Sequence, residues 1–210
     1  IVNIGSTSIF NVGFDPKFST STKALIKALR KYYGFSLLVS KGKGSHQKLE
    51  NKQISPRVVI TIPGNRSVVS PGVVLGSNVK VQNNVSIYTG VVCEDDVFLG
   101  PSMVFTNITN PRSAIIRRDS YVETKVGKGA SIGANATIVC GNEIGSFALI
   151  GAGTVITKPV KPYALVVGNP GKQIGWVSEY GHRLNFENNV GYCKESGEKY
   201  TLQDDVVKKI

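Results

Sequence analysis

The sequence predicts a mainly β protein built on a parallel β-helix of hexapeptide repeats. An aliphatic or similar residue returns at every sixth position, and a second apolar or small residue often stands two places earlier. The first series comprises Val69, Leu75, Val81, Ile87, Cys93, Leu99 and Phe105, then Val126, Ile132, Ile138, Ile144, Ile150 and Ile156. Gly often follows this series directly, as expected for corners that need unusual backbone angles. A period of six is typical of solenoids in which three short strands make one coil.

The repeat breaks once. The interval from Phe105 to Val126 is not a whole number of hexapeptides, unlike every other step in the series. Residues 106–125 therefore cannot all lie in the coils, and we predict a loop that leaves the solenoid here. Long ordered loops on rigid scaffolds often carry function, so this loop is the first candidate for a functional site.

The 210-residue chain is basic, and the basicity lies in its first third. Residues 1–66 contain 11 Lys and Arg and 2 Asp and Glu (11 − 2 = +9), whereas residues 67–210 contain 14 and 12 (14 − 12 = +2). Such a segment fits an anionic partner, most simply RNA, and a solvated lysine-rich surface is the alternative. We divide the chain into a basic unit over 1–66, a β-helix over 67–176 and a C-terminal tail over 177–210.

No apolar run approaches the length of a membrane span and no secretory signal is visible, so we expect no membrane contact and a cytoplasmic location. Cys93, Cys140 and Cys193 are odd in number and widely spaced, which predicts neither a disulfide framework nor a zinc site. We expect no bound metal, and we place Cys93 and Cys140 in the core or at corners of the coils.

The basic unit has the pattern of one helix followed by three strands. Residues 22–33 alternate apolar and basic residues at helical spacing, and Gly34 is suited to end that helix. Strands are expected over 35–40, 46–50 and 58–61.

Over residues 21–74 this unit, with its GSH motif at 44–46, resembles HicA-type toxins, which are small RNA-cleaving domains. The resemblance is incomplete, because coil sequence already occupies the place of the last helix of that family. It implies that His46 is a catalytic residue, since a single His can act as general acid or base on RNA. An RNA-binding or vestigial histidine is the alternative.

A second resemblance runs from Lys80 to about Leu202. Its segments are KVQNNVSIYTGVV, EDDVFLGPSMVFTNITNPRS, GASIGANATIVCGNEIG, FALIGAGTVITKPVKPYALVVGNPGKQIGWVSEYG and CKESGEKYTL. They resemble the left-handed β-helix N-acetyltransferases of bacterial surface-sugar synthesis. The nearest group acetylates the 3-amino group of UDP-2-acetamido-3-amino-2,3-dideoxyglucuronate, with enzymes for dTDP-3-amino sugars close behind. The resemblance implies a left-handed coil, acetyl-CoA as co-substrate, a UDP- or dTDP-linked amino sugar as acceptor, and a homotrimer.

Acyl transfer from a thioester needs an uncharged amine aligned on the carbonyl carbon, and donors for the oxygen that becomes negative. With a pKa not far from that of an α-amino group, roughly 7.7–8.0, part of a sugar amine is neutral at cellular pH, so a strong base is not essential. Neither His46 nor His182 lies in the predicted coils. By resemblance, Asn107 of the FTN motif holds the acceptor amine through its amide oxygen. A corner asparagine that satisfies backbone groups is the alternative.

The resemblance also implies contacts with the acceptor. Asn110 and Arg112 of the NPR motif are candidates for binding the sugar, its carboxylate or the diphosphate. Arg117 and Arg118 lie nearby in the sequence, where a solvated loop edge explains them equally well. Asn83 and Asn84, one coil earlier, either contact the sugar or form a stacked asparagine ladder.

For the donor, the resemblance implies a pantetheine arm along a coil edge, where small residues allow close approach to the backbone. Coil packing is the alternative reason for such residues. Two basic residues and the turn between them match the places that meet the coenzyme A phosphates. The candidates are Gly133, Ala134, Gly151, Ala152, Lys158, Asn169 and Lys172.

Overall fold

The structure is a computed structural model, and it describes residues 10–11, 36–38, 47–51, 58–62 and 67–210. The helix expected over 22–33 and His46 lie outside these residues. In the described part of the chain, no helix has the length and apolar character needed to cross a bilayer.

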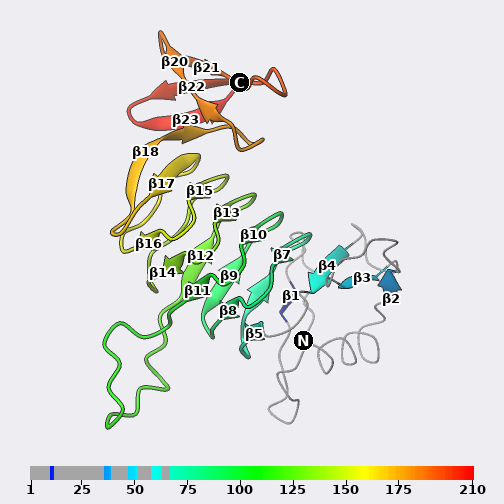
Figure 1. Cartoon of the computed structure of the whole chain (residues 1–210), viewed down its shortest axis with the longest axis vertical. Helices are drawn as coiled ribbons and strands as arrows, with labels where there is room; N and C mark the ends of the chain where they lie inside the picture. Colours follow the sequence, from blue (N-terminus) through cyan, green and yellow to red (C-terminus); the bar gives the residue numbers. More distant parts are fainter. Residues whose placement is uncertain (1–9, 12–35, 39–46, 52–57, 63–66) are drawn as a thin grey trace.

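The central part of the molecule is a prism with three faces, each made of short parallel strands (Figure 1). Face 1 contains β6 (Val74–Leu75), β9 (Val91–Cys93) and β12 (Thr124–Val126), and isolated bridges at Ile144 and Val160 continue it. Face 2 contains β7 (Lys80–Val81), β10 (Phe98–Leu99), β13 (Ser131–Ile132), β15 (Leu149–Ile150) and β17 (Ala164–Val167). Face 3 contains β5 (Val68–Val69), β8 (Ser86–Ile87), β11 (Val104–Phe105), β14 (Thr137–Ile138) and β16 (Val155–Ile156).

The fold is the predicted left-handed parallel β-helix, and the strand register shows its hexapeptide repeat. Leu99 lies opposite Val81 on face 2, so one coil is three hexapeptides long. Across the predicted loop, Val126 lies opposite Cys93 on face 1, and the chain between them is longer than one coil. The chain therefore inserts its extra residues at one corner and then resumes the same register.

Both series of the repeat point into the prism and form its core. Residues of the first series such as Ile87, Leu99 and Ile150 are fully buried, as are Val85 and Met103 of the second series. Cys93 and Cys140 are buried as expected. Fully burying an aliphatic side chain of this size stabilises a fold by about 1.5–3 kcal/mol, so the repeated series accounts for the cohesion of the coils.

The inserted loop ends two residues earlier than predicted, because Thr124 and Lys125 already belong to β12. Thr124 occupies an inward position two places before Val126, and it is 1% exposed. Its hydroxyl accepts a hydrogen bond from the backbone N–H of Gly141 at 3.1 Å. A polar residue at an inward position hid this strand from the apolar pattern.

The N-terminal strands extend the prism rather than forming a separate sheet. β2 (Ser36–Leu38), β3 (Gln47–Asn51) and β4 (Val58–Ile62) make an antiparallel meander, which agrees with the strands expected from the sequence. β4 pairs in parallel with β7, so face 2 becomes part of a ten-stranded sheet. β1 (Phe10–Asn11) pairs antiparallel with β6 on face 1. Two edges of the first coil are thus covered, which protects them from pairing with other chains. The HicA resemblance stays a prediction.

The C-terminal segment was expected to be a tail, but it folds as a small sheet beyond the last coil (Figure 1). β18 (Lys172–Val177) turns back antiparallel against β17, and β19 (Arg183–Leu184) pairs with β18. β20 (Phe186–Glu187), β21 (Val190–Tyr192), β22 (Lys199–Gln203) and β23 (Val206–Lys209) follow as an antiparallel sheet. Its buried side chains, among them Tyr200 and Cys193, join the core of the prism.

Aromatic side chains pack this C-terminal sheet against the last coil, and an ion pair links it to the segment that follows β18. The ring of Tyr163 stacks on that of Phe147 with centroids 5.3 Å apart. It also packs edge-to-face with the ring of Tyr200, with centroids 5.8 Å apart. The Lys209 ammonium lies 2.9 Å from the carboxylate of Glu179 and 2.5 Å from that of Glu198. Burial raises the pKa of Tyr163 and Tyr200 to about 12, so both phenols remain protonated at neutral pH.

Candidate functional site

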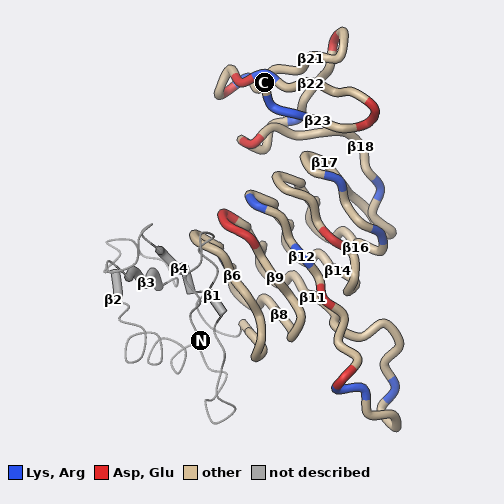
Figure 2. The backbone as a smooth tube through the Cα atoms, turned by 180° about the vertical axis from the view of Figure 1, so that it is seen from behind, with Lys and Arg blue, Asp and Glu red and all other residues tan. Residues whose placement is uncertain are grey.

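The inserted loop, residues 106–123, leaves the prism at the corner between faces 3 and 1. Figure 2 shows it standing out from the side of the prism and carrying both basic and acidic residues. At its base, the backbone N–H of Val122 donates to the carbonyl of Asn107 at 3.0 Å. The hydroxyl of Thr106 accepts from the backbone N–H of Cys140 in the next coil at 3.0 Å. The two ends of the loop are therefore held together and attached to the coil above.

Gly90, one coil earlier at the same corner, makes room for the returning end of the loop. Its φ is +98°, a backbone conformation that residues with a side chain rarely adopt. Its carbonyl accepts a hydrogen bond from the backbone N–H of Thr124 at 2.9 Å. A Cβ at this position would lie 3.1 Å from the carbonyl oxygen of Val122. A glycine is required here both by the backbone angle and by the close approach of the loop.

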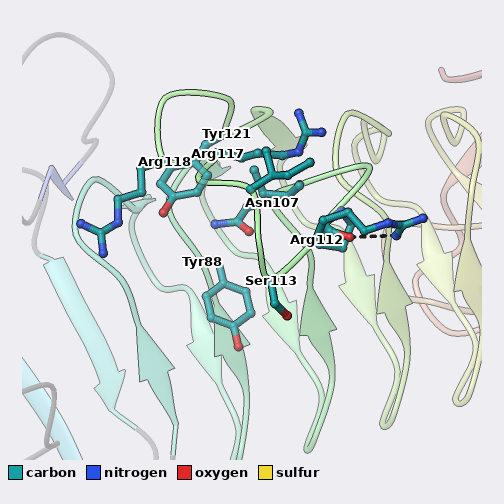
Figure 3. Close-up of a pocket in the computed structure, with 10 residues that line it drawn as sticks. Tyr88, Asn107, Arg112, Ser113, Arg117, Arg118 and Tyr121 are labelled. Carbon is teal, nitrogen blue, oxygen red and sulfur yellow. Dashed lines mark hydrogen bonds between the residues drawn. The ribbon is translucent and has the colours of Figure 1, made fainter.

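A cavity of about 530 Å³ lies between the loop and the prism, and we call it the loop hollow (Figure 3). Its lining includes three arginines and two tyrosines but no histidine, aspartate or glutamate. The lining residues are Tyr88, Asn107, Ile108, Pro111, Arg112, Ser113, Ile115, Arg117, Arg118 and Tyr121. The hollow is therefore positively charged, and it lacks a side chain that would serve as a strong base at neutral pH.

Asn107 lies at the mouth of the loop, half-buried, with its side chain beneath the loop and near Tyr88 in the view of Figure 3. Its amide has no hydrogen-bond partner among the described residues. An asparagine that served only to satisfy neighbouring backbone groups would be hydrogen-bonded to them. The side chain of Asn107 therefore does not satisfy neighbouring backbone groups, and its contact with the acceptor amine stays a prediction. Tyr88, 37% exposed, was missed by the sequence analysis because it lies in the preceding coil.

The three arginines of the hollow point in different directions. Arg112 donates to the carbonyl of its own neighbour Pro111 at 3.0 Å and points along the prism toward the C-terminal coils (Figure 3). Arg118 points the opposite way (Figure 3). The Nε of Arg117 is buried and has no hydrogen-bond partner in the described structure. The acceptor contact predicted for Arg112 thus stays a prediction, and burial distinguishes Arg117 from the solvated residue that its sequence position suggested. Asn110 is exposed in the loop and does not line the hollow.

Asn83 and Asn84 lie at a different corner, between faces 2 and 3, and do not line the hollow. Asn84 has a φ of 58°, and its Nδ2 donates to the hydroxyl of Ser102 in the next coil at 3.1 Å. The carbonyl of Asn83 accepts from the backbone N–H of Ser102 at 2.9 Å. These contacts link the two coils along the corner through asparagine and serine, and the sugar contact predicted for Asn83 and Asn84 stays a prediction.

The small residues predicted for the coenzyme stack at this same corner, where β13 and β15 turn into face 3. Gly133 has a packing reason, because a Cβ there would lie 2.6 Å from the backbone nitrogen of Ala152. Ala152 itself is exposed, so the corner presents little side-chain bulk to solvent. Asn169 forms a cis peptide with Pro170 in the turn before β18, and Lys172 begins that strand. Lys158 follows β16 at the corner shared with the loop.

The other titratable groups with shifted pKa values in the described residues lie away from the loop hollow. Burial raises the pKa of Cys93 to about 12, which makes it an unreactive thiol. Burial also opposes ionisation of Cys193, but hydrogen bonds from the Ser178 and Ser196 hydroxyls and from nearby backbone N–H groups outweigh it and lower the pKa to about 7. A hydrogen bond to Glu195 raises the pKa of His182. Within the described residues, no group of three or more His, Cys, Asp and Glu side chains is placed to hold a metal.

A prism of six-residue repeats with one inserted loop beside a cationic hollow defines the class of hexapeptide-repeat β-helix proteins. The family model described as "Hexapeptide repeat of succinyl-transferase" matches residues 64–89 and 123–158. The provisionally named acetyltransferase SAV2555 of Staphylococcus aureus is 31% identical over 137 residues, which cover 60% of this chain and 69% of that protein. The chain belongs to the hexapeptide-repeat acetyltransferase family.

Relatives with named substrates match a shorter part. A dTDP-3-amino-3,6-dideoxy-alpha-D-galactopyranose 3-N-acetyltransferase from Aneurinibacillus thermoaerophilus is 44% identical over 92 residues, covering 44% of this chain. The chain spans 47% of that enzyme and 28% of serine acetyltransferase 4 from Arabidopsis thaliana. Among solved structures, the acetyltransferase domain of PglB from Neisseria gonorrhoeae, in complex with acetyl coenzyme A, has a TM-score of 0.45 and 23% identity. That match covers 53% of this chain and 47% of the PglB chain.

Proposed function

We propose that this protein transfers the acetyl group of acetyl-CoA to the amino group of a nucleotide-linked amino sugar, in the synthesis of a surface polysaccharide precursor. The observation that carries the proposal is the position of Asn107, with a free amide at the mouth of a hollow that contains no ionisable base. The sequence similarity to a dTDP-3-amino sugar N-acetyltransferase supports the sugar class. The thiol-release assay below compares the UDP-linked and dTDP-linked sugars.

The reaction requires little acid–base catalysis. The neutral amine nitrogen attacks the thioester carbonyl carbon, the C–S bond breaks, and the proton lost by nitrogen is taken up by the departing thiolate. The products are an amide and the free thiol of coenzyme A. The amide oxygen of Asn107 accepts one N–H of the amine, which directs the nitrogen lone pair at the carbonyl. Positioning of this kind substitutes for a general base, because part of the acceptor amine is neutral already.

We also propose a homotrimer in which each site lies between neighbouring chains. Within one chain, face 3 separates the corner that carries Asn107 and Lys158 from the corner that carries Gly133 and Gly151. A second chain packed at this edge would bring the two kinds of corner together around one coenzyme. The loop supplies an apolar surface for such a contact, since Ile116 is 87% exposed.

Thiol release tests the proposed function. The protein is mixed with acetyl-CoA and a UDP- or dTDP-3-amino sugar, and free coenzyme A is measured with a thiol reagent. Asn107→Ala should lower kcat by about 100-fold, the loss typical for removal of one precisely oriented polar group in an active site. Asn185→Ala, in the C-terminal segment, is the matched control and should leave kcat unchanged. Equal kcat for the two variants, or no thiol release with any amino sugar, would show that the proposal is wrong.

The net charge of +9 over residues 1–66 favours a second candidate function, binding or cleavage of RNA by the basic unit that contains His46. Binding through phosphate contacts weakens steeply as salt rises. An RNA affinity that is unaffected between 50 and 200 mM salt, conditions across which such contacts weaken by about 10³-fold or more, would exclude it.

A further inference from the structure

The guanidinium of Arg117 carries a donor that the described protein does not satisfy. Its Nε is buried, with no hydrogen-bond partner, in the lining of the loop hollow. Buried polar groups in native proteins almost always have a partner, and an exception calls for a ligand, a water or an ion. A charged group makes the exception more costly, because desolvation penalises a charge more than a neutral dipole.

The other two arginines of the hollow have no buried nitrogen that lacks a hydrogen-bond partner. Arg112 donates to the carbonyl of Pro111, and its head points along the prism toward the C-terminal coils (Figure 3). Arg118 is exposed and points toward the N-terminal coils (Figure 3). Asp119 and Glu123 follow Arg117 in the loop, and neither forms an ion pair with it in the described structure. Arg117 is therefore the arginine of the hollow that has a buried donor without a partner in the described structure.

We propose that Arg117 binds an oxyanion of the acceptor, either the diphosphate or a carboxylate on the sugar. The inference rests on the proposed function and adds to it the residue that reads the charge of the acceptor. A planar guanidinium presents its N–H donors in a fork that matches two oxygens of a carboxylate or phosphate. No carboxylate in the lining opposes the approach of such a group, and Arg112 and Arg118 add to the positive potential that attracts it.

The geometry of the loop gives the acceptor two anchors. Asn107 opens the loop, Arg117 lies in its returning half, and both line the loop hollow, so the reacting amine and the charged group would be bound by different side chains. Tyr88 and Tyr121, each partly exposed, line the space with their rings and phenols. Two separate anchors fix the orientation of a sugar ring better than one.

Direct binding to the full chain tests the inference without requiring catalysis. Calorimetry measures the affinity of UDP, inorganic pyrophosphate and glucuronate for the wild type, Arg117→Ala, Arg117→Lys and the control Arg183→Ala. We expect Arg117→Ala to weaken at least one of these anions by about 10-fold or more, as for loss of a charge-assisted hydrogen bond. Arg117→Lys should recover only part of the affinity, because it restores charge but not the fork. Arg183→Ala should bind as the wild type does. Weakening for UDP and pyrophosphate assigns the diphosphate, and weakening for glucuronate assigns a carboxylate.

Three outcomes would overturn the inference. The wild type binds none of the three anions, or it binds them with the same affinity as Arg117→Ala, or Arg117→Ala and Arg183→Ala lose the same amount of anion affinity. Light scattering of the same variants provides a further check. If Arg117→Ala changes the oligomeric state and leaves anion affinity intact, Arg117 pairs with a neighbouring chain instead. If anion affinity depends on Arg117 but the protein never releases thiol, this inference stands and the proposed function is wrong. If the protein transfers acetyl groups but Arg117→Ala keeps normal anion affinity, the proposed function stands and this inference is wrong.

Discussion

Replacing Gly133 by alanine separates the two roles that remain open for the corner between faces 2 and 3. A Cβ at this position would lie 2.6 Å from the nitrogen of Ala152, whereas ordinary contacts begin at 3.4 Å, so adjacent coils must separate by 3.4 − 2.6 = 0.8 Å. Backbone atoms cannot rotate away, which places the cost at the upper end of the range for overpacking, about 3 kcal/mol. Alanine regains up to about 1 kcal/mol by restricting the unfolded chain.

The net destabilisation is therefore about 2 kcal/mol, which for a chain of this size lowers Tm by about 4–8 °C. Differential scanning calorimetry measures the shift. Ala152→Val serves as the matched variant, because it adds bulk on the exposed side of the same corner and should change Tm little. If the corner also holds the pantetheine arm, Ala152→Val raises the KM for acetyl-CoA at an unchanged Tm. A normal Tm for Gly133→Ala would refute the coil-spacing argument.

Two further predictions concern the loop and the C-terminal sheet. Replacing residues 108–121 by a short glycine–serine connection should leave Tm within a few degrees of wild type, since the coil register resumes at Val126, and should abolish thiol release; a collapse of Tm would show that the loop supports the fold. The folded-state pKa of Cys193 is lowered from 9.0 to about 7, so its contribution to stability appears as pH rises from about 7 and is complete above about 9. The difference in Tm between the wild type and Cys193→Ser should therefore shift in favour of the wild type as pH rises from 7 to 9. A difference in Tm that stays constant over this pH range would contradict stabilisation by a hydrogen-bonded thiolate.

The solenoid could be predicted because its signal is periodic and local. Each inward residue, such as Leu99 or Ile150, repeats the same environment, so many weak preferences point to one register. The C-terminal sheet lacks such a repeat, so the periodic pattern predicts only a tail there. Its turns contain Asn188–Asn189 and Asp204–Asp205, all with positive φ. Asn and Asp tolerate positive φ, so such pairs are typical of tight hairpin turns and predict hairpins at these positions.

The candidate site was only partly accessible from the sequence. Asn107 was found because the broken register isolates the loop that it opens. Tyr88 could not be connected to that loop, since the contact depends on how the loop folds back over the previous coil. Arg117 and Arg118 are neighbours with the same charge in the sequence, and only the folded loop shows that one has a buried nitrogen and the other is solvated. Local sequence does not encode which of two adjacent arginines is desolvated.

The corner at which the loop departs has a consequence for how such proteins diversify. The chain leaves the coils after Phe105 and returns to pair Val126 with Cys93 in the regular parallel register. Lengthening, shortening or rewriting the excursion need not disturb a single inward-facing side chain. Selection for a new acceptor can therefore act on the excursion alone, while the stack of coils that holds it remains the same.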